Sequence, residues 1–180
     1  KPDSEMFDTT VFNYETIHTR MQQQAFLNAG LKIRVFDRRP GQEAEDTLHY
    51  EGGIREYVTW LNQNKTPLHE QVIYMKGAKD DATVEVAMQY NDSYTDTIIS
   101  FANDVHTPEG GMHEEGFKRA LTNVLNNYGK KTGLIKGDDK VSGDDCREGL
   151  ACVISVKLTD AQFEGQTKAC LLYTSDAADE

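Results

Sequence analysis

Apolar residues in three segments of the chain recur every three or four positions, as they do on one face of an α-helix. The first segment follows Asn13, which suits a helix cap, and stops at Gly30, a common residue just past a helix end. Its apolar positions are Tyr14, Ile17, Met21 and Ala25. The second segment spans residues 50–61. The third, residues 113–128, is the longest, with acids at its start and lysines after its end. The pattern predicts three helices.

Five other segments either alternate apolar and polar residues or form short apolar runs, which is typical of β-strands. They are residues 31–35, 71–75, 83–90, 97–102 and 150–158. Residues 37–46 are polar and contain Pro40 and Gly41, so they predict a loop or an edge hairpin. Residues 76–81 predict the connection of a second hairpin. Strands followed by a long helix and a final strand indicate an α+β fold.

The composition is that of an acidic globular protein. Of the 180 residues 38% are hydrophobic, so a sizeable core is feasible, and the net charge of −11 argues against a protein that coats nucleic acid. A local basic surface stays possible. No apolar run reaches the ~18 residues of a membrane-spanning helix, and the N-terminus lacks the layout of a signal peptide. The three cysteines (Cys146, Cys152 and Cys170) show no metal-ligand spacing. We therefore expect a cytoplasmic protein with no membrane partner.

The sequence that follows the last strand contains the strongest functional motif. Residues 163–168 read Phe-Glu-Gly-Gln-Thr-Lys, and Gly165 is expected to take a positive φ and turn the chain sharply. The turn would present Gln166, Thr167 and Lys168 together at a loop tip. A cation beside neutral donors suits a phosphate group. The alternative is that Lys168 is an ordinary solvated lysine past a strand end.

Two other groups of side chains have both a chemical and a structural interpretation. His113 stands at a helix start beside glycines, where we expect a packing or hydrogen-bonding contact rather than catalysis. The acidic residues Asp144, Asp145 and Glu148 could hold a metal. We favour an acidic cap on a short helical turn with Arg147 as an ion-pair partner, so no metal site is predicted.

Eight short motifs follow one another along the chain and carry a family resemblance. They are YEGGIREYV (50–58), NKTPLH (64–69), VEVAMQYND (84–92), SFAND (100–104), EGGMHEEGF (109–117), REGL (147–150), ISVK (154–157) and QFEGQTK (162–168). Together they resemble the ATPase-side subunits of bacterial type II topoisomerases, and the DNA gyrase B family most closely. The resemblance covers residues 1–168, and so many ordered motifs are more specific than any one of them. Met112 departs from the family, which more commonly has threonine there.

The resemblance implies two domains and a tail. Residues 1–46 would be the C-terminal end of a GHKL-type ATPase domain, and residues 47–169 a transducer domain. The implied transducer has a βαβ-containing mixed sheet with helices on one face, a fold of the kind named after domain 2 of ribosomal protein S5. Residues 170–180 continue no earlier pattern and look like the translation of a sequencing adapter, so we expect them to take no part in the fold.

The same resemblance implies a part of an ATP-dependent type II DNA topoisomerase, an isomerase that uses ATP and Mg²⁺. Lys168 would be a catalytic ligand of the γ-phosphate, with Gln166 and Thr167 in the same nucleotide-binding contact. The family's Mg²⁺ ligand, its water-activating acid and its adenine-binding acid lie upstream of this chain, so the isolated chain is expected to be inactive. The implied partners are double-stranded DNA, the DNA-cleaving gyrase A-type subunit and a second copy bound through the ATPase domain.

Basic residues on the predicted helix 113–128 could face the cavity through which DNA passes. Lys118 matches a basic position of the family motif and Arg119 adjoins it, so these two are the predicted DNA-facing residues. The alternative is an ordinary solvated helix face. Two alternatives also remain for the chain as a whole. One is the matching subunit of topoisomerase IV, and the other is a non-catalytic interaction module in which the Gln-Thr-Lys turn is only a surface loop.

Overall fold

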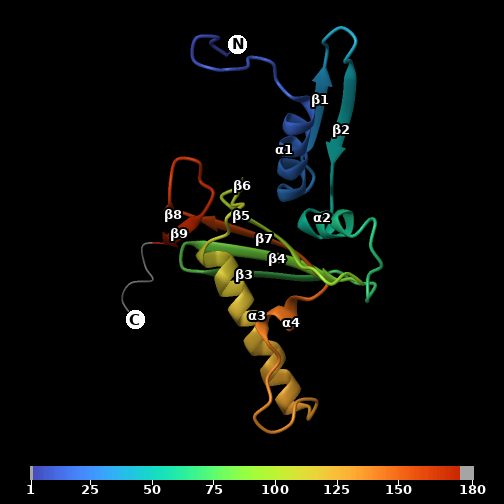
Figure 1. Cartoon of the computed structure of the whole chain (residues 1–180), viewed down its shortest axis with the longest axis vertical. Helices are drawn as coiled ribbons and strands as arrows, with labels where there is room; N and C mark the ends of the chain where they lie inside the picture. The colour runs from blue at the N-terminus through green and yellow to red at the C-terminus, as the bar shows by residue number, and fades with distance from the viewer. Residues whose placement is uncertain (1, 175–180) are drawn as a thin grey trace. The chain divides into compact units, whose positions relative to one another are not determined.

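The computed structural model describes residues 2–174 (Figure 1). The chain divides into two compact units, Lys1–Glu56 and Tyr57–Glu180. This division comes later in the sequence than the boundary expected after Asp46, which falls inside a strand of the N-terminal unit. Each unit has its own hydrophobic core.

The N-terminal unit consists of one helix and one hairpin. Its elements are helix α1 (Tyr14–Leu27) and the antiparallel strands β1 (Lys32–Asp37) and β2 (Ala44–His49). Asn13 caps the helix, since its side-chain oxygen accepts a hydrogen bond from the Thr16 amide at 3.0 Å. Its core includes a cluster of the buried residues Ala25, Val35 and Leu48. The predicted helix and first strand are confirmed, and the polar segment 37–46 is a hairpin rather than a free loop.

The C-terminal unit is built on a five-stranded sheet with the order β3-β4-β7-β5-β6. The strands are β3 (Ile73–Lys79), β4 (Ala82–Tyr90), β5 (Thr97–Ala102), β6 (Val105–His106) and β7 (Leu150–Leu158). β5 and β7 are parallel and the other neighbours are antiparallel. Helix α3 (Met112–Lys131) lies in the connection between the two parallel strands. The expected α+β fold with a βαβ unit in a mixed sheet is confirmed.

Helices cover both faces of this sheet. On one face, Leu121 of α3 belongs to a hydrophobic cluster with Ala102 of β5. Phe101 precedes Ala102 and therefore points to the other face, where its ring centroid is 6.4 Å from that of Tyr57 in helix α2 (Ile54–Leu61). The expectation of helices on one face only is wrong. The reason is that β7 is buried along almost its whole length, so both of its faces need cover.

Two elements are longer than the sequence pattern predicted. β3 continues through Lys79 into the expected hairpin connection, and the chain turns at Asp80, which has a φ of 51°. α3 extends past the edge of the sheet (Figure 1), so Val124 and Tyr128 of its apolar stripe are 62% and 61% exposed. Only the first part of the stripe faces the core.

No helix in the described part of the chain has the length and apolar character needed to cross a membrane.

A separate two-stranded sheet follows β7. β8 (Ala161–Phe163) pairs antiparallel with β9 (Leu171–Thr174). Leu171 is 3% exposed and joins the core cluster beneath α3. The expectation that residues 170–180 take no part in the fold is therefore wrong as far as Thr174, because β8 needs a partner strand and Leu171 fills a core position. Residues 175–180 lie outside the described part of the chain.

Candidate functional site

Residues 164–170 form the loop between β8 and β9 and carry the Gln-Thr-Lys motif. Two backbone hydrogen bonds close this loop. The Glu164 amide donates to the Cys170 carbonyl at 3.1 Å, and the Lys168 amide donates to the Gly165 carbonyl at 3.0 Å. The structure therefore places the motif on a loop whose base is a short hairpin.

The residue that turns this loop is not its glycine. Lys168 has a φ of 56°, in the left-handed region, whereas Gly165 lies outside that region. The expectation for Gly165 is wrong. A left-handed backbone costs a residue with a Cβ about 1–2 kcal/mol, so surrounding contacts must hold Lys168 in this conformation. The strained residue of the loop is the candidate phosphate ligand itself.

Lys168 keeps an uncompensated positive charge. The side chain is exposed, and its Nζ lies 5.6 Å from the ring centroid of Phe163, a cation–π contact that leaves the charge in place. No carboxylate within the described residues forms an ion pair with it. Gln166 and Thr167 are exposed as well. The loop thus offers a cation, an amide and a hydroxyl in sequence, a set of donors that fits a phosphate group.

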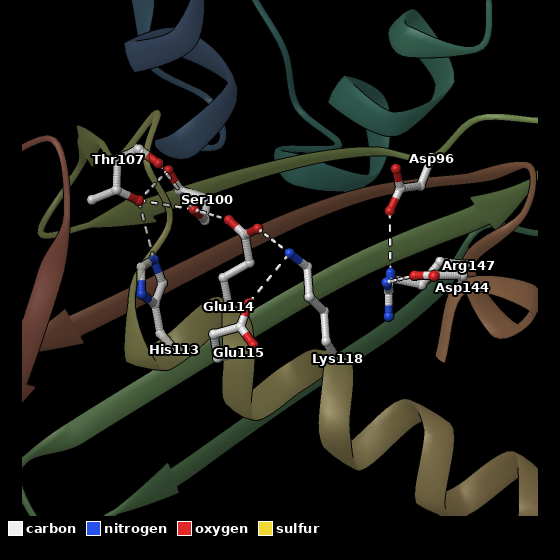
Figure 2. A network of polar contacts seen from close by, with 9 residues as sticks. All are labelled: Asp96, Ser100, Thr107, His113, Glu114, Glu115, Lys118, Asp144 and Arg147. Carbon is white, nitrogen blue, oxygen red and sulfur yellow. Dashed lines mark hydrogen bonds and ion pairs between the residues drawn. The ribbon is translucent and has the colours of Figure 1, made fainter. Parts of the chain in front are cut away.

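A polar network lies between β5 and the start of α3 (Figure 2). The Ser100 hydroxyl donates to the Glu114 carboxylate at 2.7 Å and lies 2.8 Å from the Thr107 hydroxyl. The Thr107 hydroxyl also reaches the Ser100 carbonyl at 2.9 Å and His113 Nε2 at 3.2 Å. Ser100 and Thr107 are only 1% and 2% exposed, so these bonds replace the water that both side chains lose on folding.

His113 is a hydrogen-bonding residue of this network, as the sequence indicated. Because the Ser100 hydroxyl donates to Glu114 and the Thr107 hydroxyl donates to Ser100, we assign Nε2 of His113 as the donor to Thr107. Its Nδ1 is buried and has no hydrogen-bond partner among the described residues. Burial lowers the pKa of His113, and the nearby Glu114 charge opposes this only in part. Burial thus favours the neutral imidazole.

Lys118 is bound to the same network. Its Nζ lies 2.8 Å from the Glu114 carboxylate and 3.5 Å from that of Glu115 (Figure 2). The hydrogen bond to Glu114 raises the pKa of Lys118. Arg119 is exposed and forms no ion pair within the described part of the chain. The two residues predicted to face DNA thus differ, since one is held by two carboxylates and the other is free in solvent.

The short helix α4 (Gly143–Arg147) accounts for the acidic cluster. Ser142 and Asp145 form a reciprocal capping box at its start. Arg147 pairs with Asp144 at 2.5 Å and with Asp96 at 3.2 Å (Figure 2). The interpretation as an acidic cap with Arg147 as ion-pair partner is confirmed.

Sequence reasoning missed the partners of His113. Ser100 stands in the apolar run Ile98-Ile99-Ser100-Phe101, and a hydroxyl at a core-facing strand position is a signal that a hydrogen-bond partner must lie nearby. Thr107 carried no such signal, because only the return of the chain through β6 brings it opposite Ser100.

The fold resembles those of one class of protein, the ATPase regions of gyrase B proteins. The structure matches the 43K ATPase domain of Thermus thermophilus gyrase B with a TM-score of 0.78 and 36% identity, covering 96% of this chain and 46% of that one. It matches the B-subunit of the DNA gyrase from Myxococcus xanthus with a TM-score of 0.79 and 25% identity, covering 94% and 47%. The mixed α+β sheet is shared with both.

The sequence comparison gives the family. The DNA gyrase B family profile matches residues 53–178. The DNA gyrase B protein of Staphylococcus epidermidis is 54% identical over 173 residues, which are 95% of this chain and 27% of that protein. The chain belongs to the DNA gyrase B family, and it spans little more than a quarter of the length of this curated relative.

Proposed function

We propose that this chain is the nucleotide-sensing part of an ATP-dependent type II DNA topoisomerase, within the gyrase B protein, and that Lys168 contacts the γ-phosphate of ATP. Gln166 makes a second contact to the same group, and Thr167 adds a hydroxyl donor to the nucleotide contact. One observation carries the proposal. The Lys168 ammonium is exposed on the loop and has no acidic partner among the described residues.

The proposed contact depends on the state of the nucleotide. A γ-phosphate is present in ATP and absent in ADP, so a charge-assisted bond from Lys168 exists only before hydrolysis. A cation at this position also stabilises the negative charge that develops on the transferring phosphoryl group. Loss of the bond would release the loop between β8 and β9. In the proposal, this release couples ATP hydrolysis to DNA strand passage and supercoiling.

The proposal also assigns the parts of the chain. Residues 1–46 would be the end of the GHKL-type ATPase domain, and residues 47–169 the transducer. ATP and Mg²⁺ would be held largely by residues of the full-length protein outside this chain, so the isolated chain would not hydrolyse ATP. The full-length protein would act in the cytoplasm with double-stranded DNA, the DNA-cleaving gyrase A protein and a second copy of gyrase B.

The variant Lys168→Ala in the full-length protein, assembled with gyrase A, tests the proposal. We expect ATP turnover to fall about 100-fold or more, while the affinity for ADP is unchanged because ADP has no γ-phosphate. Lys140→Ala is the matched control, since Lys140 is an exposed lysine in a loop of the same unit. Wild-type turnover in Lys168→Ala would contradict the proposal and favour the non-catalytic interaction module.

A further inference from the structure

The loop that carries Lys168 is fastened to the segment immediately before α3. Three backbone contacts do this: Glu109 amide to Ala169 carbonyl at 3.0 Å, Leu171 amide to Gly110 carbonyl at 3.1 Å, and a parallel bridge between Gly111 and Leu171. The first of them involves the residue directly after Lys168. Residues 109–111 therefore fix the position of residues 169–171, which follow Lys168 in the loop and the start of β9.

Gly111 is the tightest point of this contact. Its φ of 137° is one that side-chain-bearing residues rarely adopt, and an added Cβ would lie 2.3 Å from the carbonyl oxygen of Leu171 and 2.6 Å from its amide nitrogen. Both neighbours are backbone atoms, which cannot rotate away as a flexible side chain could. Any residue larger than glycine at this position must therefore push β9 and the attached loop away from α3.

The polar network holds the same segment from its other side. The Gly110 amide donates to the Thr107 carbonyl at 2.9 Å. Glu114, in the first turn of α3, accepts the Ser100 hydroxyl at 2.7 Å and pairs with Lys118 at 2.8 Å (Figure 2). Hydrogen bonds thus join the start of α3 to β5, a strand inside the sheet. The segment 109–111 is consequently held in place from both sides and forms a rigid support for the loop.

We propose that Gly111 and Glu114 are positioning residues for Lys168. They fix the segment 109–111, which supports the loop and so positions the Lys168 ammonium, and neither contacts the nucleotide itself. This inference rests on the proposed role of Lys168. Misplacing a reacting group by about 1 Å can cost a factor of about 100 in rate. A Cβ at position 111 would require a displacement approaching that size, since the contact of 2.3 Å has to open to at least 3.0 Å.

Gly111→Ala in the full-length protein tests the inference, with Gly116→Ala as the matched control. Gly116 lies in the first turns of α3, the helix that Gly111 precedes, and a Cβ added there meets no atom within 4 Å. We expect Gly111→Ala to lower kcat for ATP at least tenfold, to leave ADP affinity unchanged, and to speed hydrogen exchange of the Leu171 amide. Gly116→Ala should match the wild type in all three measurements.

The double variant, Gly111→Ala together with Lys168→Ala, distinguishes an effect on the position of Lys168 from a general loss of structure. If Gly111 acts through Lys168, then adding Gly111→Ala to a Lys168→Ala protein changes kcat no further. Wild-type kcat in the Gly111→Ala protein overturns the inference. So does a double variant in which Gly111→Ala lowers kcat by the same factor as it does in the wild-type protein. Wild-type ATP turnover in the Lys168→Ala protein would overturn the proposed function instead.

Ser100→Ala provides the same test without adding volume, should the Gly111→Ala protein not fold. It removes the hydroxyl that donates to Glu114, so we expect kcat to fall several-fold in the otherwise wild-type protein and not at all in the Lys168→Ala protein. Ser93→Ala is the control, because the Ser93 hydroxyl donates to the Thr95 carbonyl at an exposed site and to no other group among the described residues. Unchanged kcat in a folded Ser100→Ala protein overturns the inference.

Discussion

Lys168 and Lys118 are motif lysines in the same unit, yet their surroundings are opposite. Lys168 stands in an exposed loop with no ion pair to a described residue, whereas the Lys118 side chain is 25% exposed and lies between the carboxylates of Glu114 and Glu115. A cation already held by two carboxylates has little charge left for an anionic ligand, while an unpaired cation retains all of it. Residue type and motif therefore identify the candidates, and the neighbouring carboxylates decide which one is available.

Substituting the two lysines separately is the strongest way to break this comparison. The Lys168→Ala protein should lose about 100-fold in ATP turnover, and its thermal unfolding midpoint should not change. The Lys118→Ala protein should keep an ATP turnover within several-fold of the wild type. The Lys118→Ala protein should instead lose about 1 kcal/mol in the free energy of unfolding, because Glu114 loses its ion pair with Lys118. Steady-state kinetics and thermal unfolding of both variants measure the two effects. The opposite ranking would show that Lys118 is the functional cation.

The polar network that holds Lys118 also contains His113, which gives the stability of the folded protein a pH dependence. Burial lowers the pKa of His113 in the folded state. Below the ordinary histidine pKa of about 6.5, the unfolded chain therefore binds a proton that the folded chain does not. The free energy of unfolding should fall as pH decreases from that value toward the lowered pKa, and this contribution should be constant above it.

Urea unfolding across this pH range measures the effect, and His113→Gln should reduce the slope. His49→Gln is a suitable control, since His49 lies outside the network and on the partly exposed strand β2. An equal slope in the wild type and in His113→Gln would assign the pH dependence to other groups.

The smallest expected effect concerns DNA. Arg119 is exposed and unpaired within the described residues, so Arg119→Ala in the assembled enzyme should reduce the slope of log binding constant against log salt by about one unit. Lys118→Ala should leave that slope unchanged, because its charge is already neutralised. Fluorescence anisotropy of duplex DNA at several salt concentrations compares the two. Equal slopes for both variants would place Lys118 at the DNA surface despite its ion pairs.

Several elements could be predicted from short stretches of sequence. The cap at Asn13 and the apolar spacing after it specified α1, and the apolar run 150–158 specified β7 with its observed bounds. Helix caps, helical periodicity and strand alternation act between residues a few positions apart, so a local pattern contains them. The acidic cap of α4 was predictable for the same reason.

What the sequence alone determined is thus the order and type of the elements, the family motifs and the identity of the candidate residues. Only the tertiary structure decided that Leu171 returns to Gly111, that helices cover both faces of the sheet, and that Lys118 is paired while Lys168 has no ion pair among the described residues. These outcomes depend on contacts between residues distant in the chain and on the burial that those contacts create. Sequence spacing does not encode which carboxylate a folded chain brings beside a lysine, because that depends on how the strands and helices pack.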